Sequence, residues 1–189
     1  MNLLVEIPDP SLVLLLGSSG AGKSTFAARH FHPTEIISSD RCRAMICDDE
    51  SDQTINAEAF GLLHHIARLR LQQRRLTVID ATNLQFRARR PLLRMARAHR
   101  IPLIAIVFQI PLETCLTHNQ ARPARQVEQV VLELHQQQLA TTLSRLDREG
   151  YNRIYMLEKS QLANLTIKKL KQKPEANDRP IAGQIGAKH

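Results

Sequence analysis

The sequence contains no tryptophan, and aromatic residues make up only 4% of the 189-residue chain. A row of stacking aromatic side chains is therefore not expected to be the main means of contacting nucleobases. Cysteine is also scarce, with three in all and no Cys-x-x-Cys pair. This pattern argues against a structural zinc site and is typical of reduced thiols in a cytoplasmic protein.

Long hydrophobic runs are missing as well, and none approaches the roughly 20 residues of a membrane-spanning helix. The first twelve residues have no basic start, and their apolar run is interrupted by Glu6, Pro8, Asp9 and Pro10, so they do not resemble a signal peptide. We therefore expect a cytoplasmic protein with no membrane partner.

Acidic residues are outnumbered, with 18 Asp and Glu against 26 Lys and Arg, which leaves a net charge of +8. Such a surface attracts polyanions, including nucleic acids, through phosphate contacts and counterion release. A soluble protein that merely happens to be basic has the same composition, so charge alone does not separate the two interpretations.

Short apolar runs alternate with longer amphipathic stretches along most of the chain. Strands are predicted at residues 12–16, 35–37, 76–79, 103–108 and 153–157, and helices at residues 22–30, 54–75, 86–99, 112–121 and 127–148. The strands are apolar throughout, as in sheets covered on both faces. This order predicts an α/β fold, a P-loop NTPase-type parallel sheet flanked by helices with a helical lid. We expect one domain over residues 1–165 and a flexible, basic and polar tail over residues 166–189.

The clearest motif is GSSGAGKS at residues 17–24, which satisfies G-x-x-x-x-G-K-[ST] between a predicted strand and helix. Its predicted nucleotide-binding residues are Gly17, Ser18, Ser19, Gly20, Ala21, Gly22, Lys23 and Ser24, followed by Thr25. In such loops glycines let successive N–H groups face the phosphates, the lysine reaches the β- and γ-phosphates, and the serine hydroxyl binds Mg²⁺. The sequence thus predicts ATP or another nucleoside triphosphate, with Mg²⁺. The motif leaves open whether the phosphate goes to an acceptor or to water.

A candidate for the acceptor side follows the second predicted strand, in the segment ISSDRCR. Asp40 stands where that strand ends, at the same sheet edge as the phosphate loop. A carboxylate there would accept the proton of an attacking hydroxyl. Arg43, one helical turn later, would contact a phosphate-bearing substrate. Alternatively, Asp40 caps the helix and forms a surface ion pair with Arg43.

A third group of polar residues ends the apolar run LTVID. Asp80 is a candidate to hold a magnesium-bound water or to orient Ser24 and Lys23; capping of the next turn is the alternative. Thr82 and Asn83 follow in the same loop, and either position an acceptor strand or simply form the turn.

Several basic residues have no clear role by spacing alone. Four arginines share one face of the predicted helix at 86–99, namely Arg87, Arg90, Arg94 and Arg97. Solvation explains such a face more often than nucleic-acid binding, and we favour solvation here. The histidines without metal spacing are interpreted as ordinary surface or half-buried residues: His64, His65, His99 and His135.

Taken together, GSSGAGKSTFA, ISSDRCR, LTVIDATN and NQARPARQV resemble, in order and spacing, the kinase module of bacterial polynucleotide kinase-phosphatase. The resemblance runs from about Leu12 to about Leu157. It implies transfer of the NTP γ-phosphate to a 5′-OH end of RNA or DNA. It also implies that Asp40 is the general base and that Arg43 contacts the phosphate beside the acceptor nucleoside.

The resemblance further implies a lid over the nucleotide, formed by Arg122, Arg125 and Gln126, in which arginine stabilises the charge of the transferring phosphoryl group. Pro123 lies between the two arginines and breaks the helical pattern. A solvated basic loop is the alternative. This chain departs from the family in carrying His118 where the family lid begins with an arginine.

The implied partners are a nucleic acid with a 5′-OH end, other repair proteins and a second copy of the chain in a homodimer. The phosphatase and nucleotidyltransferase domains that often follow in the family are not expected in this length. Two other functions remain open: a P-loop kinase of a nucleoside-like or sugar-containing acceptor, and a non-catalytic NTP-binding subunit of a repair complex.

Overall fold

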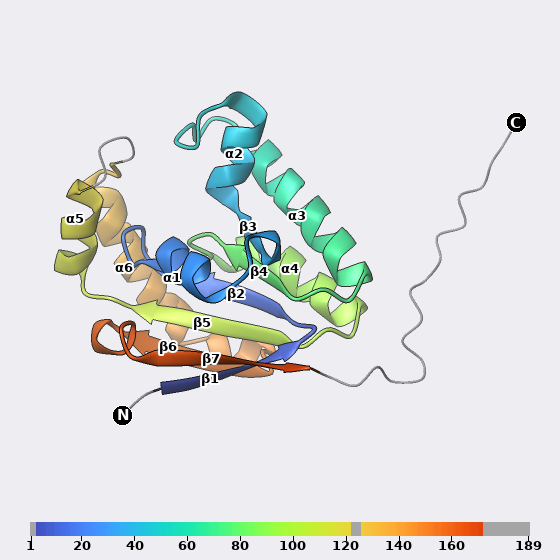
Figure 1. Ribbon diagram of the computed structural model, residues 1–189. Helices are drawn as coiled ribbons and strands as arrows, with labels where there is room; N and C mark the ends of the chain where they lie inside the picture. The colour runs from blue at the N-terminus through green and yellow to red at the C-terminus, as the bar shows by residue number, and fades with distance from the viewer. Residues whose placement is uncertain (1–2, 122–125, 172–189) are drawn as a thin grey trace, which may run out of the picture.

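The computed structural model describes residues 3–121 and 126–171. Its centre is a five-stranded parallel sheet in the order β3-β4-β2-β5-β6 (Figure 1). The strands are β2 Leu12–Leu16, β3 Ile36–Ser38, β4 Thr77–Asp80, β5 Leu103–Gln109 and β6 Arg153–Glu158. All five predicted strands are therefore present, and the predicted α/β class is confirmed.

The central strand β2 shows why the predicted strands are apolar throughout. Leu12, Leu14 and Leu16 pack into a core on one face of the sheet. Val13 and Leu15 pack into a second core on the other face. Because helices or strands cover both faces, alternate side chains are equally buried and no polar position remains within the strand.

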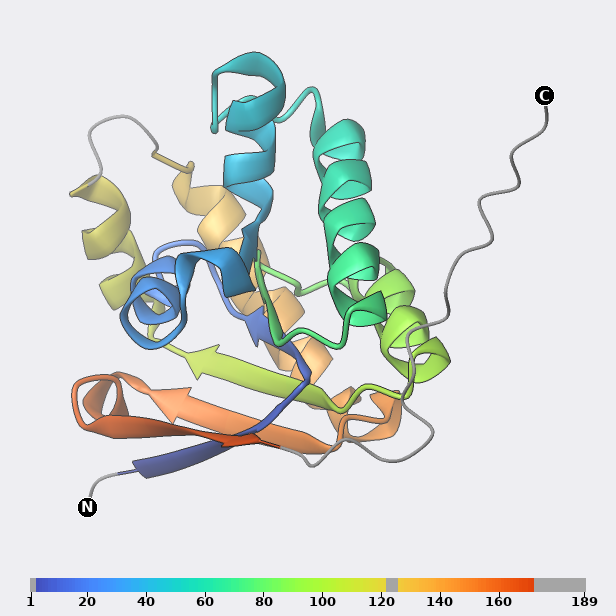
Figure 2. The same cartoon turned by 45° about the vertical axis from the view of Figure 1, so that its right-hand side comes forward.

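The helices divide between the two faces. They are α1 Lys23–His30, α2 Ser39–Cys47, α3 Asn56–Gln72, α4 Phe86–Ala98, α5 Leu112–Gln120 and α6 Gln129–Leu143. Side chains of α2, α3, α4 and α6 build the first core, and α3 and α4 lie side by side (Figure 2). Side chains of α1 and α5 build the second. No helix in the described ranges has the length and apolarity needed to cross a membrane.

The predicted helix over residues 127–148 is shorter than expected. Helix α6 ends at Leu143, and a separate 3₁₀ helix, η2, covers Leu146–Glu149. The turn between them places Leu146 in the core and brings Glu149 to α4. Two further 3₁₀ turns, Pro33–Glu35 and Lys159–Gln161, connect other elements.

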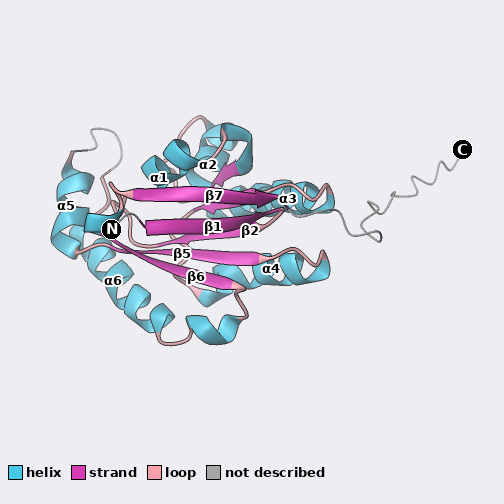
Figure 3. Ribbon diagram, turned by 60° about the horizontal axis from the view of Figure 1, so that its bottom comes forward, coloured by secondary structure: helices cyan, strands magenta, loops and turns pink. Residues whose placement is uncertain are grey.

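A two-stranded parallel ribbon completes the second face, and neither of its strands is predicted by the sequence pattern. Strand β1, Leu3–Asp9, pairs with β7, Leu165–Lys171 (Figure 3). Val5 and Ile7 are fully buried against α1 and the sheet, with Leu165 beside them.

The prediction of a flexible tail beginning at residue 166 is therefore wrong for residues 166–171, and the boundary at residue 165 falls inside a strand. The lysines of LTIKKLK concealed the strand, because they occupy its exposed positions. Lys169 bonds Glu35 at 2.6 Å, and Lys168 lies 3.9 Å from Glu6. The rest of the predicted tail, residues 172–189, lies outside the described residues.

A buried ion pair joins α4 to η2. Arg89 is only 1% exposed, and its Nε donates to the Glu149 carboxylate at 2.8 Å, with a second contact from Nη2. The remaining nitrogen, Nη1, donates to the Asn83 carbonyl at 2.7 Å. One guanidinium thus holds together α4, η2 and the loop after β4.

Removing one partner of this pair is expected to destabilise the fold. Glu149→Ala leaves the Arg89 charge buried and unpaired, which should lower the free energy of unfolding by about 3–5 kcal/mol. Asp147→Ala, an exposed acidic position in the same turn, is the matched control and should change it by less than about 0.5 kcal/mol. Urea unfolding measures the free energy of unfolding of both variants. Equal losses in the two would contradict the role of the Arg89–Glu149 pair in holding the fold.

Candidate active site

The phosphate-loop motif forms the turn between β2 and α1. Gly20 and Gly22 have φ angles of +78° and +87°, a region that residues with a Cβ rarely adopt. Gly22 is the N-cap of α1, so the loop leads directly into the positive end of the helix. Such a turn followed by a helix N-terminus is a binding site for phosphate.

Lys23 lies inside this turn. It is buried, and its Nζ donates to the carbonyl oxygens of Gly17 at 2.9 Å and Ser18 at 2.7 Å. Lys23 and the exposed Ser24 both line a cavity of about 940 Å³. The loop's own carbonyl groups therefore hold the ammonium group at the wall where a nucleotide's phosphates would sit.

The loop after β4 braces the phosphate loop. The Gly17 N–H donates to the Thr82 carbonyl at 3.1 Å, and Asn83 Nδ2 donates to the Leu15 carbonyl at 2.8 Å. Asn83 is buried and has a φ of +50°, which suits asparagine in a tight turn. For Asn83 the contacts support the turn-forming interpretation, and both Thr82 and Asn83 line the cavity.

Asp80 ends β4 at the middle of the sheet edge. It stands in register with Ser38 of β3 and Leu15 of β2, so it lies between the acceptor segment and the phosphate loop. Its side chain is buried and lines the same cavity as Ser24. A hydroxyl and a carboxylate at one wall fit the oxygen ligands that Mg²⁺ takes, directly or through water.

The predicted acceptor segment opens helix α2. The N-cap is Ser38, whose side chain accepts the Arg41 N–H, so Asp40 is not the cap. Asp40 instead contacts Arg43, and the two side chains are only 16% and 5% exposed. The ion pair of the alternative interpretation is therefore present, but it is largely buried and both residues line the cavity.

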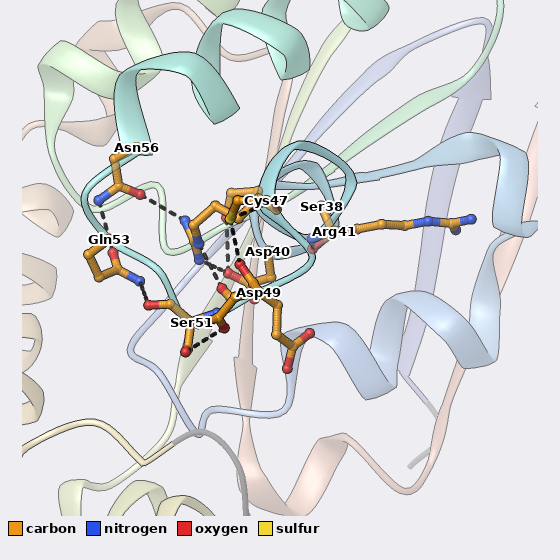
Figure 4. A network of polar contacts seen from close by, with 11 residues as sticks. Ser38, Asp40, Arg41, Cys47, Asp49, Ser51, Gln53 and Asn56 are labelled. Atoms are coloured by element: carbon orange, nitrogen blue, oxygen red, sulfur yellow. Dashed lines mark hydrogen bonds and ion pairs between the residues drawn. The ribbon is translucent and has the colours of Figure 1, made fainter.

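Arg43 is held from several directions. Its Nε donates to the Glu50 carbonyl at 2.7 Å and its Nη1 to Asn56 Oδ1 at 2.8 Å, while Nη2 contacts Asp40. Figure 4 shows this network, with Asp40 on α2 and Asn56 at the start of α3. The guanidinium thereby fixes the Asp40 carboxylate against two helices.

The loop between α2 and α3 is itself ordered by side-chain bonds. The Asp49 carboxylate accepts from the Ser51 N–H at 2.8 Å and from its hydroxyl at 2.6 Å (Figure 4). These hydrogen bonds lower the pKa of Asp49. Ser51 also lines the cavity, so the loop forms part of the wall beside Arg43.

The predicted lid is described only in part, because Arg122 and Arg125 lie outside the described residues. Asn119 clamps the two sides of that segment: its amide donates to the Val127 carbonyl at 2.8 Å and accepts the Val127 N–H at 2.9 Å. Gln126 is exposed and lines the cavity.

His118, the residue that departs from the family pattern, contacts the phosphate loop itself. Its Nδ1 lies 2.9 Å from the Gly20 carbonyl oxygen. The imidazole therefore supports the loop backbone from α5. No feature of the sequence around residue 118 indicated this contact.

Two other histidines line the cavity although their spacing indicated no role. The Ser19 N–H donates a weak hydrogen bond to Nδ1 of His135, which lies on α6; the two nitrogens are 3.5 Å apart. Burial, and secondarily the charge of Lys23, lowers the pKa of His135. Burial also lowers the pKa of His64. Both histidines come from helices distant in sequence from the phosphate loop, so only folding places them in the same cavity.

One cavity thus brings together the phosphate loop, Asp40, Arg43 and Asp80, which defines the class of a P-loop nucleotide-binding protein with the fold of P-loop kinases. Residues 12–147 match the family described as AAA domain, and the chain belongs to that family. No curated protein matches the sequence.

Solved structures share the fold. A chain of the Pnkp1/Rnl/Hen1 RNA repair complex matches at 24% identity and a TM-score of 0.63, over 72% of this chain and 46% of that one. A gluconokinase from Sinorhizobium meliloti matches at 17% identity and a TM-score of 0.51, over 82% of this chain and 87% of that one. Chaetomium thermophilum Kti12 in complex with ADP-AlF3 matches at 13% identity and a TM-score of 0.53, over 80% of this chain and 93% of that one. This chain thus spans about half of the RNA repair chain.

Substitution of Gly20 tests the loop geometry. Gly20→Ala strains a φ of +78° and drives the new Cβ into the Cys115 carbonyl oxygen, so it should weaken ATP binding and cost about 1–3 kcal/mol of stability. Gly61→Ala, where a Cβ meets open space in helix α3, should instead stabilise by about 0.5–1 kcal/mol with ATP affinity unchanged. Thermal unfolding and binding of a fluorescent ATP analogue distinguish them; tight binding by Gly20→Ala would contradict the loop's role.

Proposed function

We propose that the protein is a Mg²⁺-dependent polynucleotide 5′-hydroxyl kinase, which transfers the γ-phosphate of ATP or another NTP to a 5′-OH end of RNA or DNA. The observation that carries the proposal is the Asp40 carboxylate, pinned by Arg43 in the same cavity as the phosphate loop. The ordered set of motifs and the RNA repair chain among the structures of the same fold support it.

On the nucleotide side, the loop N–H groups and Lys23 bind the phosphates. Lys23 exchanges its present carbonyl partners in part for phosphate oxygens. Ser24 and Asp80 would hold Mg²⁺, directly or through water. A bound Mg²⁺ would neutralise part of the charge of the nucleotide's phosphates.

On the acceptor side, Asp40 accepts the proton of the 5′-hydroxyl as the hydroxyl oxygen attacks the γ-phosphorus in line. The bond from the γ-phosphorus to the bridging oxygen breaks, and the nucleoside diphosphate leaves. The Arg43 guanidinium has five N–H donors. Its three contacts within the protein leave N–H groups that can bind an acceptor phosphate. Arg43 therefore has two proposed roles: it holds Asp40 in position, and it binds a phosphate of the acceptor.

The family resemblance assigns Arg122 and Arg125 to the γ-phosphate, with Arg122 stabilising the charge of the transferring group. Gln126, which lines the cavity, is assigned to the nucleotide with them. His118 does not replace an arginine donor in this arrangement, because it holds the loop backbone.

The decisive experiment supplies γ-labelled ATP with a 5′-OH oligonucleotide, a nucleoside, gluconate or no acceptor. Label should appear on the oligonucleotide. Asp40→Asn should lower kcat by about 10²–10⁴-fold with ATP affinity unchanged, because the base is lost but the phosphate loop is intact. Glu58→Gln, an exposed carboxylate of α3 outside the cavity, is the matched control and should retain wild-type kcat.

Transfer only to the nucleoside or to gluconate would refute the proposal in favour of a small-acceptor kinase. Phosphate release without transfer would indicate an ATPase. Tight ATP binding with neither phosphate transfer nor phosphate release would indicate a non-catalytic subunit.

The two tasks of Arg43 are separable by kinetics. Arg43→Lys keeps a positive charge but not the fork that reaches Glu50, Asn56 and Asp40 together. We expect kcat to fall at least about tenfold while the acceptor KM rises less, and the loss should be much smaller in an Asp40→Asn background. A rise in acceptor KM alone, with unchanged kcat, would show that Arg43 only binds substrate.

A further inference from the structure

A second cavity, of about 1100 Å³, lies between α4 and the C-terminal end of α6 with η2. Five exposed arginines line it, and we refer to it as the arginine groove: Arg90, Arg94 and Arg97 of α4, with Arg145 and Arg148 opposite. The α4 arginines were interpreted from the sequence as a solvated face. The structure changes that interpretation, because two more arginines face them from a distant part of the chain.

The positive charge of the groove is not compensated. Within residues 3–121 and 126–171, Arg90, Arg94, Arg145 and Arg148 form no ion pair. The groove's one acidic lining residue, Glu149, is buried and already paired with Arg89. A concave surface lined by cations with low-dielectric walls concentrates a field that attracts an anionic chain.

The arginine groove borders the active-site cavity. The two cavities share four lining residues: Leu84, Gln85, Leu134 and Gln138. The Leu84 carbonyl accepts from the Thr142 hydroxyl at 2.6 Å, which fixes this junction to α6. The groove therefore lies next to the cavity that holds Asp40, within reach of a chain whose end lies there.

The junction also exposes apolar side chains. Phe86, at the start of α4, is 51% exposed and lines the groove, and Leu134 of α6 is 48% exposed. An exposed aromatic ring beside a row of cations is the combination that binds single-stranded nucleic acid, with a base on the ring and phosphates on the cations. The arginines of α4 recur about once per helical turn of 5.4 Å, so they form a track rather than one point charge.

We propose that the arginine groove binds the single-stranded polynucleotide that extends from the acceptor end, with phosphates on Arg94 and Arg148 and a base on Phe86. This inference rests on the proposed kinase function and adds the extended strand to it. Contacts of this kind are to backbone and base faces, so they give affinity for chain length without sequence preference.

The test compares Arg94→Ala/Arg148→Ala with a control that removes the same charge elsewhere, Arg68→Ala/Lys168→Ala. Arg68 of α3 and Lys168 of β7 are exposed and line neither cavity. Kinase activity is measured on a 5′-OH dinucleotide and on a single strand of about 16 nucleotides, long enough for one binding site. Binding of the labelled strand is measured separately, without ATP, by fluorescence anisotropy over a salt series.

In the groove variant, Kd and KM for the longer strand should rise about tenfold or more, with kcat and the dinucleotide KM unchanged. The slope of log Kd against log salt should become shallower by about 1.4, because each phosphate contact to a single strand contributes about 0.7 to that slope. Phe86→Ala should weaken strand binding with an unchanged salt slope, because stacking releases no counterions. The control should match the wild type.

Equal strand binding by the groove variant and the wild type would overturn the proposal and leave the groove to an acidic protein partner. A shift of equal size in the control would overturn it too, because bulk charge would then be the cause. Absence of transfer even to the dinucleotide, with groove-dependent strand binding intact, would instead refute the kinase function and retain the groove as a nucleic-acid site.

Discussion

The arrangement of this protein depends on one constraint, that parallel strands end at a common edge. Strands β3, β4 and β2 are neighbours, with Ser38, Asp80 and Leu15 in register. Each is followed at that edge by a polar segment, because a chain leaving a buried strand must satisfy its backbone groups outside the sheet. The phosphate loop, Asp80 and the acceptor segment around Asp40 meet for this reason, although they are far apart in sequence.

Two arginines then hold these segments in place, each by several acceptors at once. Arg43 joins Asp40 to the Glu50 carbonyl and Asn56, and Arg89 joins Glu149 to the Asn83 carbonyl. Burial of a single ion pair is rarely stabilising by itself, since desolvation opposes the Coulombic attraction. Several hydrogen bonds to one guanidinium offset that penalty and also fix direction, which a point charge does not. Arg43 thereby orients the proposed base, and Arg89 anchors the loop that braces the phosphate loop.

The parts of the fold that were predictable from sequence are those with a strong local signal. Strand β2 is an unbroken apolar run, and GSSGAGKS specifies a turn between a strand and a helix. Strand β7 was missed because Lys168 and Lys169 sit at exposed positions next to half-buried Ile167 and Leu170, a composition that also suits a solvated tail. Strand β7 forms because it pairs in parallel with β1, and no pattern within residues 165–171 predicts that pairing.

By itself, the sequence determined the phosphate loop, the strand order along the chain and Asp40 as the residue at a strand end, because each depends on neighbours within a few positions. Only the tertiary structure decided that Arg43 also reaches the Glu50 carbonyl and Asn56 of α3, that His118 and His135 contact the loop, and that Arg145 faces the arginines of α4. These contacts join residues on different elements. Their existence depends on how helices pack across a sheet, and side-chain spacing along one element does not record that packing.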